Sequence, residues 1–241
     1  DKKAIETCLT EEQIQKIEYY ELYALAANIL VQDGSFEYTT KRGWTEEFCK
    51  KNGVASIKWD TLKNKICSTL KVEADYLVNR DIVKEIFDED KIIYTIYDKK
   101  KRPVAFAARN IKFKEGSNLP KFRNTSGYVP ISPKGGQLYG YHIACKSPDD
   151  RVDIFEGYGD WLTAQQNGIE NCVAVCGTTI NDQHIELIRS AGFKNINIVF
   201  DGDNAGNTKL RVYLEKLSNL PGIRVTGLAL PFDDDQPEDK R

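Results

Sequence analysis

The spacing of apolar and polar residues changes about 90 residues into the chain. Before that point the apolar positions recur at helical spacing, in residues 1–32 and again in residues 60–88, which predicts a first helix and then one or two more. Thr10 is placed to cap the first helix. A shorter helix is predicted between Thr45, a capping residue, and Gly53, a helix stop. The first third of the chain is therefore expected to be mainly helical.

Beyond Lys91 the spacing becomes that of strands. Two runs rich in β-formers, "KIIYTIYD" and "VAFAARNIKF", flank the turn "KKKRP" and predict an antiparallel hairpin. The next stretch, residues 114–140, is rich in Gly, Pro, Ser and Asn and shows little periodicity. We expect it to form a long ordered loop or a set of short strands, and loops of that length are usually functional or disordered.

From residue 151 onward, short apolar strands alternate with helical stretches. The strands are "RVDIF", "NCVAV", "NINIVF" and "RVTGLAL", and this alternation predicts a parallel sheet with helices on its faces. The expected fold class is α/β, or α+β overall: a parallel sheet flanked by helices, preceded by a mixed subdomain of helices and antiparallel strands. We place the domain boundary between residues 148 and 149, which gives domains of residues 1–148 and 149–241.

The distribution of charge changes what the first of these domains is expected to bind. The net charge of the chain is only −2, but residues 91–146 hold twelve Lys or Arg against two acids, a local charge of +10 that leaves −12 for the remainder. Such a basic stretch is either a solvated face or a surface that attracts the phosphates of a nucleic acid.

Composition excludes several other classes of protein. With 41% hydrophobic and 29% charged residues the chain is typical of a soluble globular protein, and no apolar run approaches the roughly 20 residues of a membrane span. We find no signal-peptide pattern and expect an intracellular protein without membrane contact. The six cysteines form no C-x-x-C pair, so we expect reduced thiols and no zinc.

Acidic residues follow two strands of the predicted parallel sheet. Glu156 ends the first strand in "DIFEGYGD", and Asp201 and Asp203 end the third in "IVFDGDNAG". The carboxyl ends of parallel strands meet at one edge, where ligands bind, and like charges gathered there call for a divalent cation. Oxygen ligands without His or Cys favour Mg²⁺ or Mn²⁺, which points to phosphoryl transfer. Asp-Gly-Asp alone is more typical of a turn; its combination with Glu156 favours the metal site.

Several short motifs recur at compatible spacing in this part of the chain: "EGY-x-D", "GI-x-N-x-VA", the "GT" after the second strand, and "DGD-x-AG". Together they resemble the toprim domain of bacterial DnaG-type DNA primases. Upstream, "RG-x-x-x-E", "LPKFRNTS" and "SPKGGQLYGYHIA" are similar to the helical and basic parts of the primase catalytic core. The resemblance covers roughly residues 20–240.

The resemblance implies roles for the acids. Glu156 would be the catalytic carboxylate, as general base or metal ligand, and Asp201 and Asp203 would bind the catalytic metals. Asp160 and, in the acidic tail, Asp235 would be further metal ligands, although the tail departs from the family pattern and leaves open which of its aspartates reaches the metal.

The resemblance also implies which polar residues hold nucleotide phosphates or the template. They are Lys121, Lys134, Arg109, Asn124 and Arg123. Ordinary surface charge is the alternative for each of them.

The implied enzyme is a DNA primase, a DNA-directed RNA polymerase that makes short RNA primers from ribonucleoside triphosphates on single-stranded DNA. It would use Mg²⁺ or Mn²⁺, with two or more ions, in the cytoplasm of a bacterium or of the host of a phage. We expect neither a zinc-binding module nor a helicase-binding domain within the given residues, so a replicative helicase would be contacted only through regions outside this chain. Two alternatives stay open: a toprim nuclease that cleaves DNA, and a non-catalytic DNA-binding module whose acids hold a structural ion.

Overall fold

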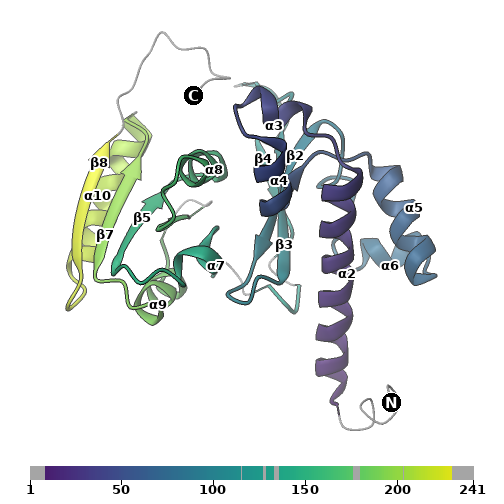
Figure 1. The fold of residues 1–241 in the computed structure, drawn as a ribbon, viewed down its shortest axis with the longest axis horizontal. Helices are drawn as coiled ribbons and strands as arrows, with labels where there is room; N and C mark the ends of the chain where they lie inside the picture. The colour runs from purple at the N-terminus through teal and green to yellow at the C-terminus, as the bar shows by residue number, and fades with distance from the viewer. Residues whose placement is uncertain are drawn as a thin grey trace. The chain divides into compact units, whose positions relative to one another are not determined.

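The chain folds into two compact units, which comprise residues 1–134 and 135–241. The computed structural model describes residues 9–114, 116–126, 129–132, 136–175, 180–202 and 204–229, and Figure 1 shows the elements of both units. The domain boundary between residues 148 and 149 stays a prediction. The boundary between the two compact units lies earlier in the chain, so that residues 136–148 belong to the second unit.

Threonine residues cap two helices of the first unit. Its described helices are α2 (Glu11–Asp33), α3 (Glu37–Lys41), α4 (Glu46–Asn52), α5 (Trp59–Leu70) and α6 (Ala74–Val78). Thr10 caps α2, since its hydroxyl accepts a 3.2 Å hydrogen bond from the backbone N–H of Gln13. Thr45 caps α4, and Gly53 ends that helix with a left-handed φ of 70°. The predicted caps and the predicted stop are confirmed.

Of the helices that the structure describes, none is long and apolar enough to cross a membrane.

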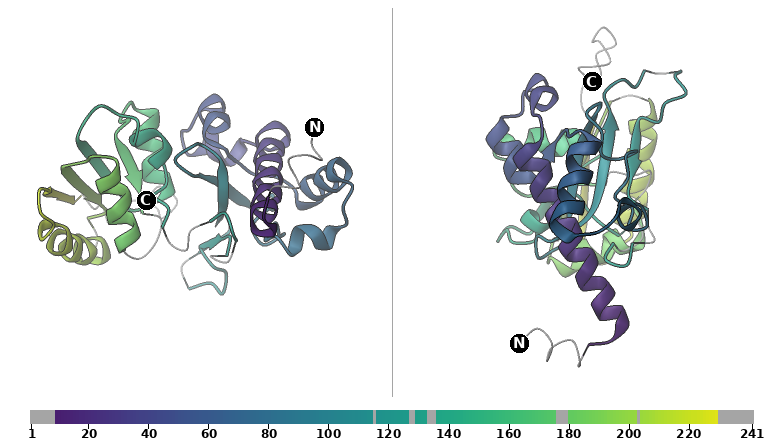
Figure 2. Two further views of the ribbon diagram at one scale, coloured as in Figure 1. Left: turned by 90° about the horizontal axis from the view of Figure 1, so that it is seen from below. Right: turned by 90° about the vertical axis from the view of Figure 1, so that its right-hand side faces the viewer.

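The sheet of the first unit is antiparallel, with strand order β1-β2-β3-β4. Its strands are β1 (Val54–Ala55), β2 (Lys91–Tyr97), β3 (Pro103–Asn110) and β4 (Phe122–Asn124). β2 and β3 form the predicted hairpin, and β4 adds a short strand from the Gly- and Pro-rich stretch. α2 packs against β3 (Figure 2), where Tyr23 of the helix contacts Phe106 with ring centroids 5.2 Å apart. Both rings are fully buried, so this contact anchors the long helix to the sheet.

The sheet of the second unit is parallel throughout, with strand order β6-β5-β7-β8. Its strands are β5 (Arg151–Phe155), β6 (Cys172–Ala174), β7 (Asn195–Phe200) and β8 (Arg224–Ala229), and its helices are α7 (Tyr141–Ala144), α8 (Tyr158–Gln166), α9 (Asp182–Ser190) and α10 (Asn204–Ser218). α10 lies along β7 and β8 (Figure 1), and α8 contacts β6. The predicted parallel sheet with flanking helices is confirmed.

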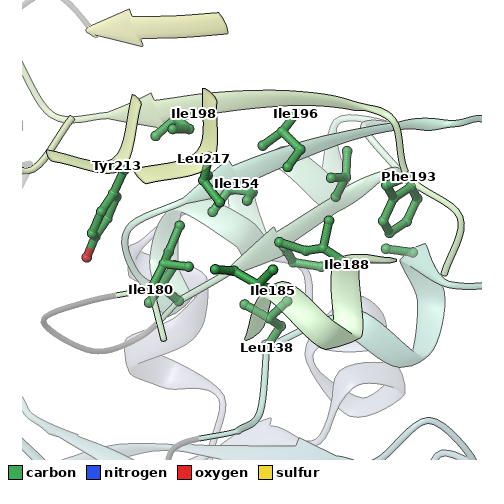
Figure 3. Packing of buried hydrophobic residues seen from close by; sticks show 14 of the residues in the cluster. Leu138, Ile154, Ile180, Ile185, Ile188, Phe193, Ile196, Ile198, Tyr213 and Leu217 are labelled. Atoms are coloured by element: carbon green, nitrogen blue, oxygen red, sulfur yellow. The ribbon is translucent and has the colours of Figure 1, made fainter. Parts of the chain in front are cut away.

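One apolar cluster joins this sheet to α9 and α10 (Figure 3). The labelled members come from β5 and β7 (Ile154, Ile196, Ile198), from α9 (Ile185, Ile188), from α10 (Tyr213, Leu217) and from the connecting segments (Leu138, Ile180, Phe193). Burying one such aliphatic side chain stabilises the fold by about 1.5–3 kcal/mol. The cluster therefore fixes α10 firmly on the sheet, at the edge where β5 and β7 end.

The segment before β5 closes the β6 side of the same sheet. Tyr139 exchanges two backbone hydrogen bonds of 2.9 Å with Ala174 of β6, and its ring packs edge-to-face on Trp161 of α8, with centroids 4.8 Å apart. Gly140 follows with a φ of 83°, and a Cβ at this position would lie 2.0 Å from Trp161 Nε1. Because that nitrogen donates a 2.9 Å hydrogen bond to a β6 carbonyl, the indole cannot move away without losing the bond. Position 140 therefore requires glycine.

Candidate functional site

Two acidic residues stand at neighbouring strand ends in the second unit. Glu156 directly follows β5, and Asp201 directly follows β7. The two strands pair in parallel, with Phe155 opposite Val199 and no strand between them. Glu156 and Asp201 therefore leave the sheet at the same edge and on adjacent strands. Glu156 is half-buried and Asp201 is exposed.

Glu156 is held by an ion pair with a lysine of α10. Lys209 Nζ donates to Glu156 Oε1 at 2.5 Å, and the two side chains are only 32% and 28% exposed. Partial burial reduces screening by water, so this pair is stronger than a fully exposed one. Tyr213, one turn further along α10, lies near the same carboxylate. The pKa of its hydroxyl is raised, mainly by burial and in smaller part by the negative charge of Glu156.

The same helix also holds the loop that follows β7. Asn207 Nδ2 donates a 2.7 Å hydrogen bond to the carbonyl of Gly202, the residue after Asp201. Asn207 and Lys209 are two residues apart, and Leu210 beside them belongs to the apolar cluster. One helix, fixed by the core, therefore contacts both acid-bearing strand ends.

Asp160 caps α8 immediately after the Glu156 strand end. Its Oδ2 accepts a 2.9 Å hydrogen bond from the backbone N–H of Gly157. A carboxylate at a helix N-terminus satisfies an otherwise unpaired N–H and interacts favourably with the helix dipole. The bond tightens the turn between β5 and α8, so Asp160 helps to place Glu156. Its role as a metal ligand stays a prediction.

The donor atoms at this edge suit a hard divalent cation. Glu156 and Asp201 offer carboxylate oxygens, which Mg²⁺ and Mn²⁺ prefer, and the ion pair with Lys209 shows that the Glu156 carboxylate attracts a positive charge. Within the residues that the structure describes, no three His, Cys, Asp or Glu side chains form a group that could hold a metal ion. Asp203, the expected third ligand, lies outside those residues. The two described carboxylates fit such an ion, and the full ligand set stays a prediction.

The first unit carries a basic and aromatic surface on its edge strand. Arg109 of β3 lies opposite Phe122 of β4, with its guanidinium 6.0 Å from the centroid of that ring. The Phe122 side chain is 37% exposed. Lys121, just before β4, places its ammonium 5.9 Å from the ring centroid of Phe113. Positive charges interleaved with accessible rings are typical of surfaces that bind single-stranded nucleic acid.

The strand pleat distributes these side chains over both faces of β4. Arg109 and Phe122 share one face with Asn124, two residues along, whereas Arg123 lies on the other. Partial burial lowers the pKa of Lys91 at the start of β2, and the positive charge of Arg123 lowers it further, against the opposing effect of nearby acids. Arg123 is therefore within electrostatic reach of a second basic residue.

The structure thus gathers the predicted site residues into two groups, one in each unit. The second unit holds Glu156 and Asp201 at its strand ends and Asp160 in the first turn of α8. The first unit holds the polar residues on β3 and beside or on β4, which are Arg109, Lys121, Arg123 and Asn124. Three predicted residues lie outside the described ranges: Asp203, Asp235 and Lys134.

Sequence reasoning did not single out Lys209 or Asn207. A signal for the lysine does exist, because it stands in the second turn of a helix that follows an acidic loop. A positive charge that follows an acidic loop so closely is attracted to that loop, which makes the predicted carboxylates its candidate partners.

Two family models match the stretches of chain in which these two groups of residues lie. The family model of the toprim domain matches residues 150–229, which contain the whole parallel sheet. The model of the DNA primase catalytic core, N-terminal domain, matches residues 24–145, half of the chain. The chain belongs to the DNA primase catalytic core family. The resemblance drawn from the sequence motifs is confirmed.

Similarity to individual primases extends over most of this chain but over a smaller part of theirs. A DNA primase of Pseudomonas aeruginosa is 34% identical over 212 residues, which is 82% of this chain and 31% of that protein. The crystal structure of a DNA primase domain from Pseudomonas aeruginosa matches with a TM-score of 0.69 and 26% identity, over 89% of this chain and 72% of that one. A DnaG primase catalytic domain bound to single-stranded DNA shares the fold, with a TM-score of 0.70 and 24% identity over 93% of this chain and 74% of that one. The chain spans about a third of the length of the curated primases it matches.

Proposed function

We propose that this chain is the catalytic core of a DNA primase, which joins ribonucleoside triphosphates on a single-stranded DNA template into short RNA primers. The observation that carries this proposal is the parallel pairing of β5 with β7, which puts Glu156 and Asp201 at adjacent strand ends. Membership of the primase family supports it. The place of action would be the cytoplasm of a bacterium, or of the host cell of a phage.

The acids of the second unit are proposed to hold the metal. Membership of the toprim and primase families implies dependence on a divalent metal ion in general. We assign Glu156, Asp201 and Asp203 to Mg²⁺ or Mn²⁺, two ions or more, with Asp160 and Asp235 as further ligands. A divalent cation there supplies charge compensation on the attacking and leaving oxygens of phosphoryl transfer.

The surface on β3 and β4 is proposed to bind the phosphates of the nucleotide or the template. Arg109, Lys121 and Arg123 supply positive charge, and Asn124 supplies a further polar contact. Lys134, which lies outside the described residues, is assigned to the same ligands. Phe122 offers an exposed ring on which a base can stack. The primase domain solved with single-stranded DNA shares this fold and supports the assignment.

A primer-synthesis assay with variants of the strand-end acids tests the proposal. Purified protein receives single-stranded template, labelled ribonucleotides and Mg²⁺ or Mn²⁺, and the products are separated by length. We expect short RNA from the wild type and a loss of at least about 100-fold for Asp201→Asn and Glu156→Gln, because each removes a full charge while keeping the side-chain size. Asp182→Asn removes a carboxylate that is 96% exposed at the start of α9 and should leave synthesis unchanged.

The same assay distinguishes the two alternatives. Degradation of the template without synthesis would replace the primase proposal by a nuclease. DNA binding with neither activity, and unchanged in Asp201→Asn, would indicate a non-catalytic binding module.

A further inference from the structure

Lys209 is a residue of the candidate site to which the proposed function gives no role. Its ammonium donates to Glu156 Oε1 at 2.5 Å, although Glu156 is the carboxylate assigned to a metal ion. A cation that approaches Glu156 must therefore meet a positive charge that is already in place. The position of this lysine calls for an explanation.

The ion pair differs from the exposed pairs that form within single helices of the chain. Lys16 and Glu12 pair within one helix, with side chains 43% and 73% exposed, and such pairs contribute little to stability. Lys209 and Glu156 instead join two elements that are 53 residues apart in sequence, and both side chains are about one-third exposed. The pair therefore ties α10 to the end of β5.

The backbone that carries Lys209 is fixed on both sides. Two residues before it, Asn207 is bonded to the Gly202 carbonyl at 2.7 Å, and directly after it Leu210 is buried in the apolar cluster. The ammonium is thus presented to Glu156 by a rigid helix rather than by a mobile loop.

A tethered ammonium at this place has two physical effects. It orients the carboxylate, because one of its oxygens is engaged by Lys209. It also supplies a positive charge next to Glu156, which competes with any other cation for that carboxylate.

We propose that Lys209 is a positioning residue that holds Glu156 in place in the metal-free site and releases it to the incoming divalent cation. This inference rests on the proposed function in that Glu156 is taken there as a metal ligand. It follows that the site binds a divalent ion more weakly, but in a better-defined arrangement, than its carboxylates would without the lysine.

Titration of the protein with Mn²⁺, followed by the electron paramagnetic resonance of the free ion, tests this without requiring catalysis. Lys209→Gln and Lys209→Ala should bind Mn²⁺ more tightly, on the order of fivefold, because one positive charge near the ion is gone. Lys209→Arg keeps the charge and should bind Mn²⁺ like the wild type. Lys216→Ala is the matched control, since it removes a lysine of the same helix that pairs instead with Asp182 at 3.3 Å.

Primer synthesis adds a second readout that a purely structural role would not produce. The Mg²⁺ concentration at half the maximal rate should fall in Lys209→Gln by about the same factor as the Mn²⁺ dissociation constant. The maximal rate should fall as well, because Glu156 is less well placed. Lys209→Arg should restore both values toward those of the wild type.

The outcomes separate this proposal from the proposed function. Equal or weaker Mn²⁺ binding by Lys209→Gln, with folding verified by circular dichroism, overturns the role of Lys209, even where the wild type makes primers. If Lys209→Ala fails to fold, Lys209→Gln alone decides. A wild type that makes no primers, while the neutral variants gain Mn²⁺ affinity, refutes the primase reaction and leaves the role of Lys209 standing.

Discussion

Among single residues, Cys172 shows how strongly the interior of the second unit controls side-chain chemistry. It is fully buried in β6, and its thiol donates a 3.1 Å hydrogen bond to the carbonyl of Ile169. Burial raises the pKa of this thiol from its ordinary value of 9.0 to about 12. Because the thiolate is the reactive form, Cys172 should be inert in the folded protein at neutral pH.

We expect iodoacetamide near neutral pH to leave Cys172 unmodified in the native protein, as judged by mass spectrometry of its peptides. Cys67 and Cys145 are partly exposed and should react, which provides the internal control, and all three should react in denaturant.

The raised pKa of Cys172 has a further consequence for stability. As pH rises above 9.0, the thiol of the unfolded chain loses its proton while the buried thiol of the folded protein keeps it. The contribution of Cys172 to the free energy of unfolding is therefore fully present below pH 9.0 and is lost between pH 9.0 and about 12.

The position of a residue in the fold could be predicted where it depends on near neighbours in the sequence, and not where it depends on a distant partner. The position of Asp201 at a strand end is recognisable from the apolar strand before it and the Gly-Asp after it. Lys209 has its partner in Glu156, 53 residues earlier. Asn207 likewise depends on the course of the loop at Gly202.

Among the elements, the packing of α8 against the segment before β5 depends on one glycine. We expect Gly140→Ala to lower the free energy of unfolding by about 2–5 kcal/mol, because alanine is strained at this φ and its Cβ would overlap the Trp161 indole. Gly168→Ala is the matched control, with a φ of 88° and no atom within 4 Å of the added Cβ, and should cost only about 1–2 kcal/mol. Urea unfolding of both variants measures the difference. Equal losses would contradict the close contact at position 140.

Helices with a capping residue or with helical periodicity could be predicted from the sequence, whereas α3 and α7 could not. Thr10 and Thr45 mark helix starts through contacts made within three residues. α3 is five residues long and contains two β-branched threonines, and α7 is four residues long and has no capping side chain. Such short helices depend on tertiary packing rather than on local preference. β4 was expected only as a loop or a short strand, because its pairing with β3 is not encoded in its three residues.

For the whole molecule, the uneven distribution of charge predicts how DNA binding responds to salt. Residues 91–146 carry +10 and the remainder −12. The affinity for single-stranded DNA should fall linearly with salt on logarithmic axes, with a slope of about −0.7 for each phosphate neutralised. Lys121→Ala should weaken binding and make the slope shallower by about 0.7, as measured by fluorescence anisotropy with a labelled oligonucleotide. Lys16→Ala, an exposed lysine of α2, should change neither, and an unchanged slope in Lys121→Ala would remove that residue from the proposed surface.

The order of the strands is the part of the molecule that sequence reasoning could not reach. Alternation of strands and helices predicts parallel pairing, but it does not say which strands are neighbours. β5 pairs with β7 although β6 lies between them in the chain, and this order alone brings Glu156 and Asp201 to adjacent positions. The assignments of Asp203, Asp235 and Lys134 stay predictions.

The same strand order determines which parts of the second unit can fray. Among the described strands, β8 and β6 form the margins of the sheet: β8 pairs with β7, and β6 pairs with β5 and is held on its other side by the two hydrogen bonds between Ala174 and Tyr139, whereas β5 and β7 lie between two strands. A marginal strand detaches by breaking one ladder, while an inner strand must break two, so local opening begins at the margins. As the protein warms, the marginal strands should lose their hydrogen bonds first, while β5 and β7, which end at Glu156 and Asp201, keep their register.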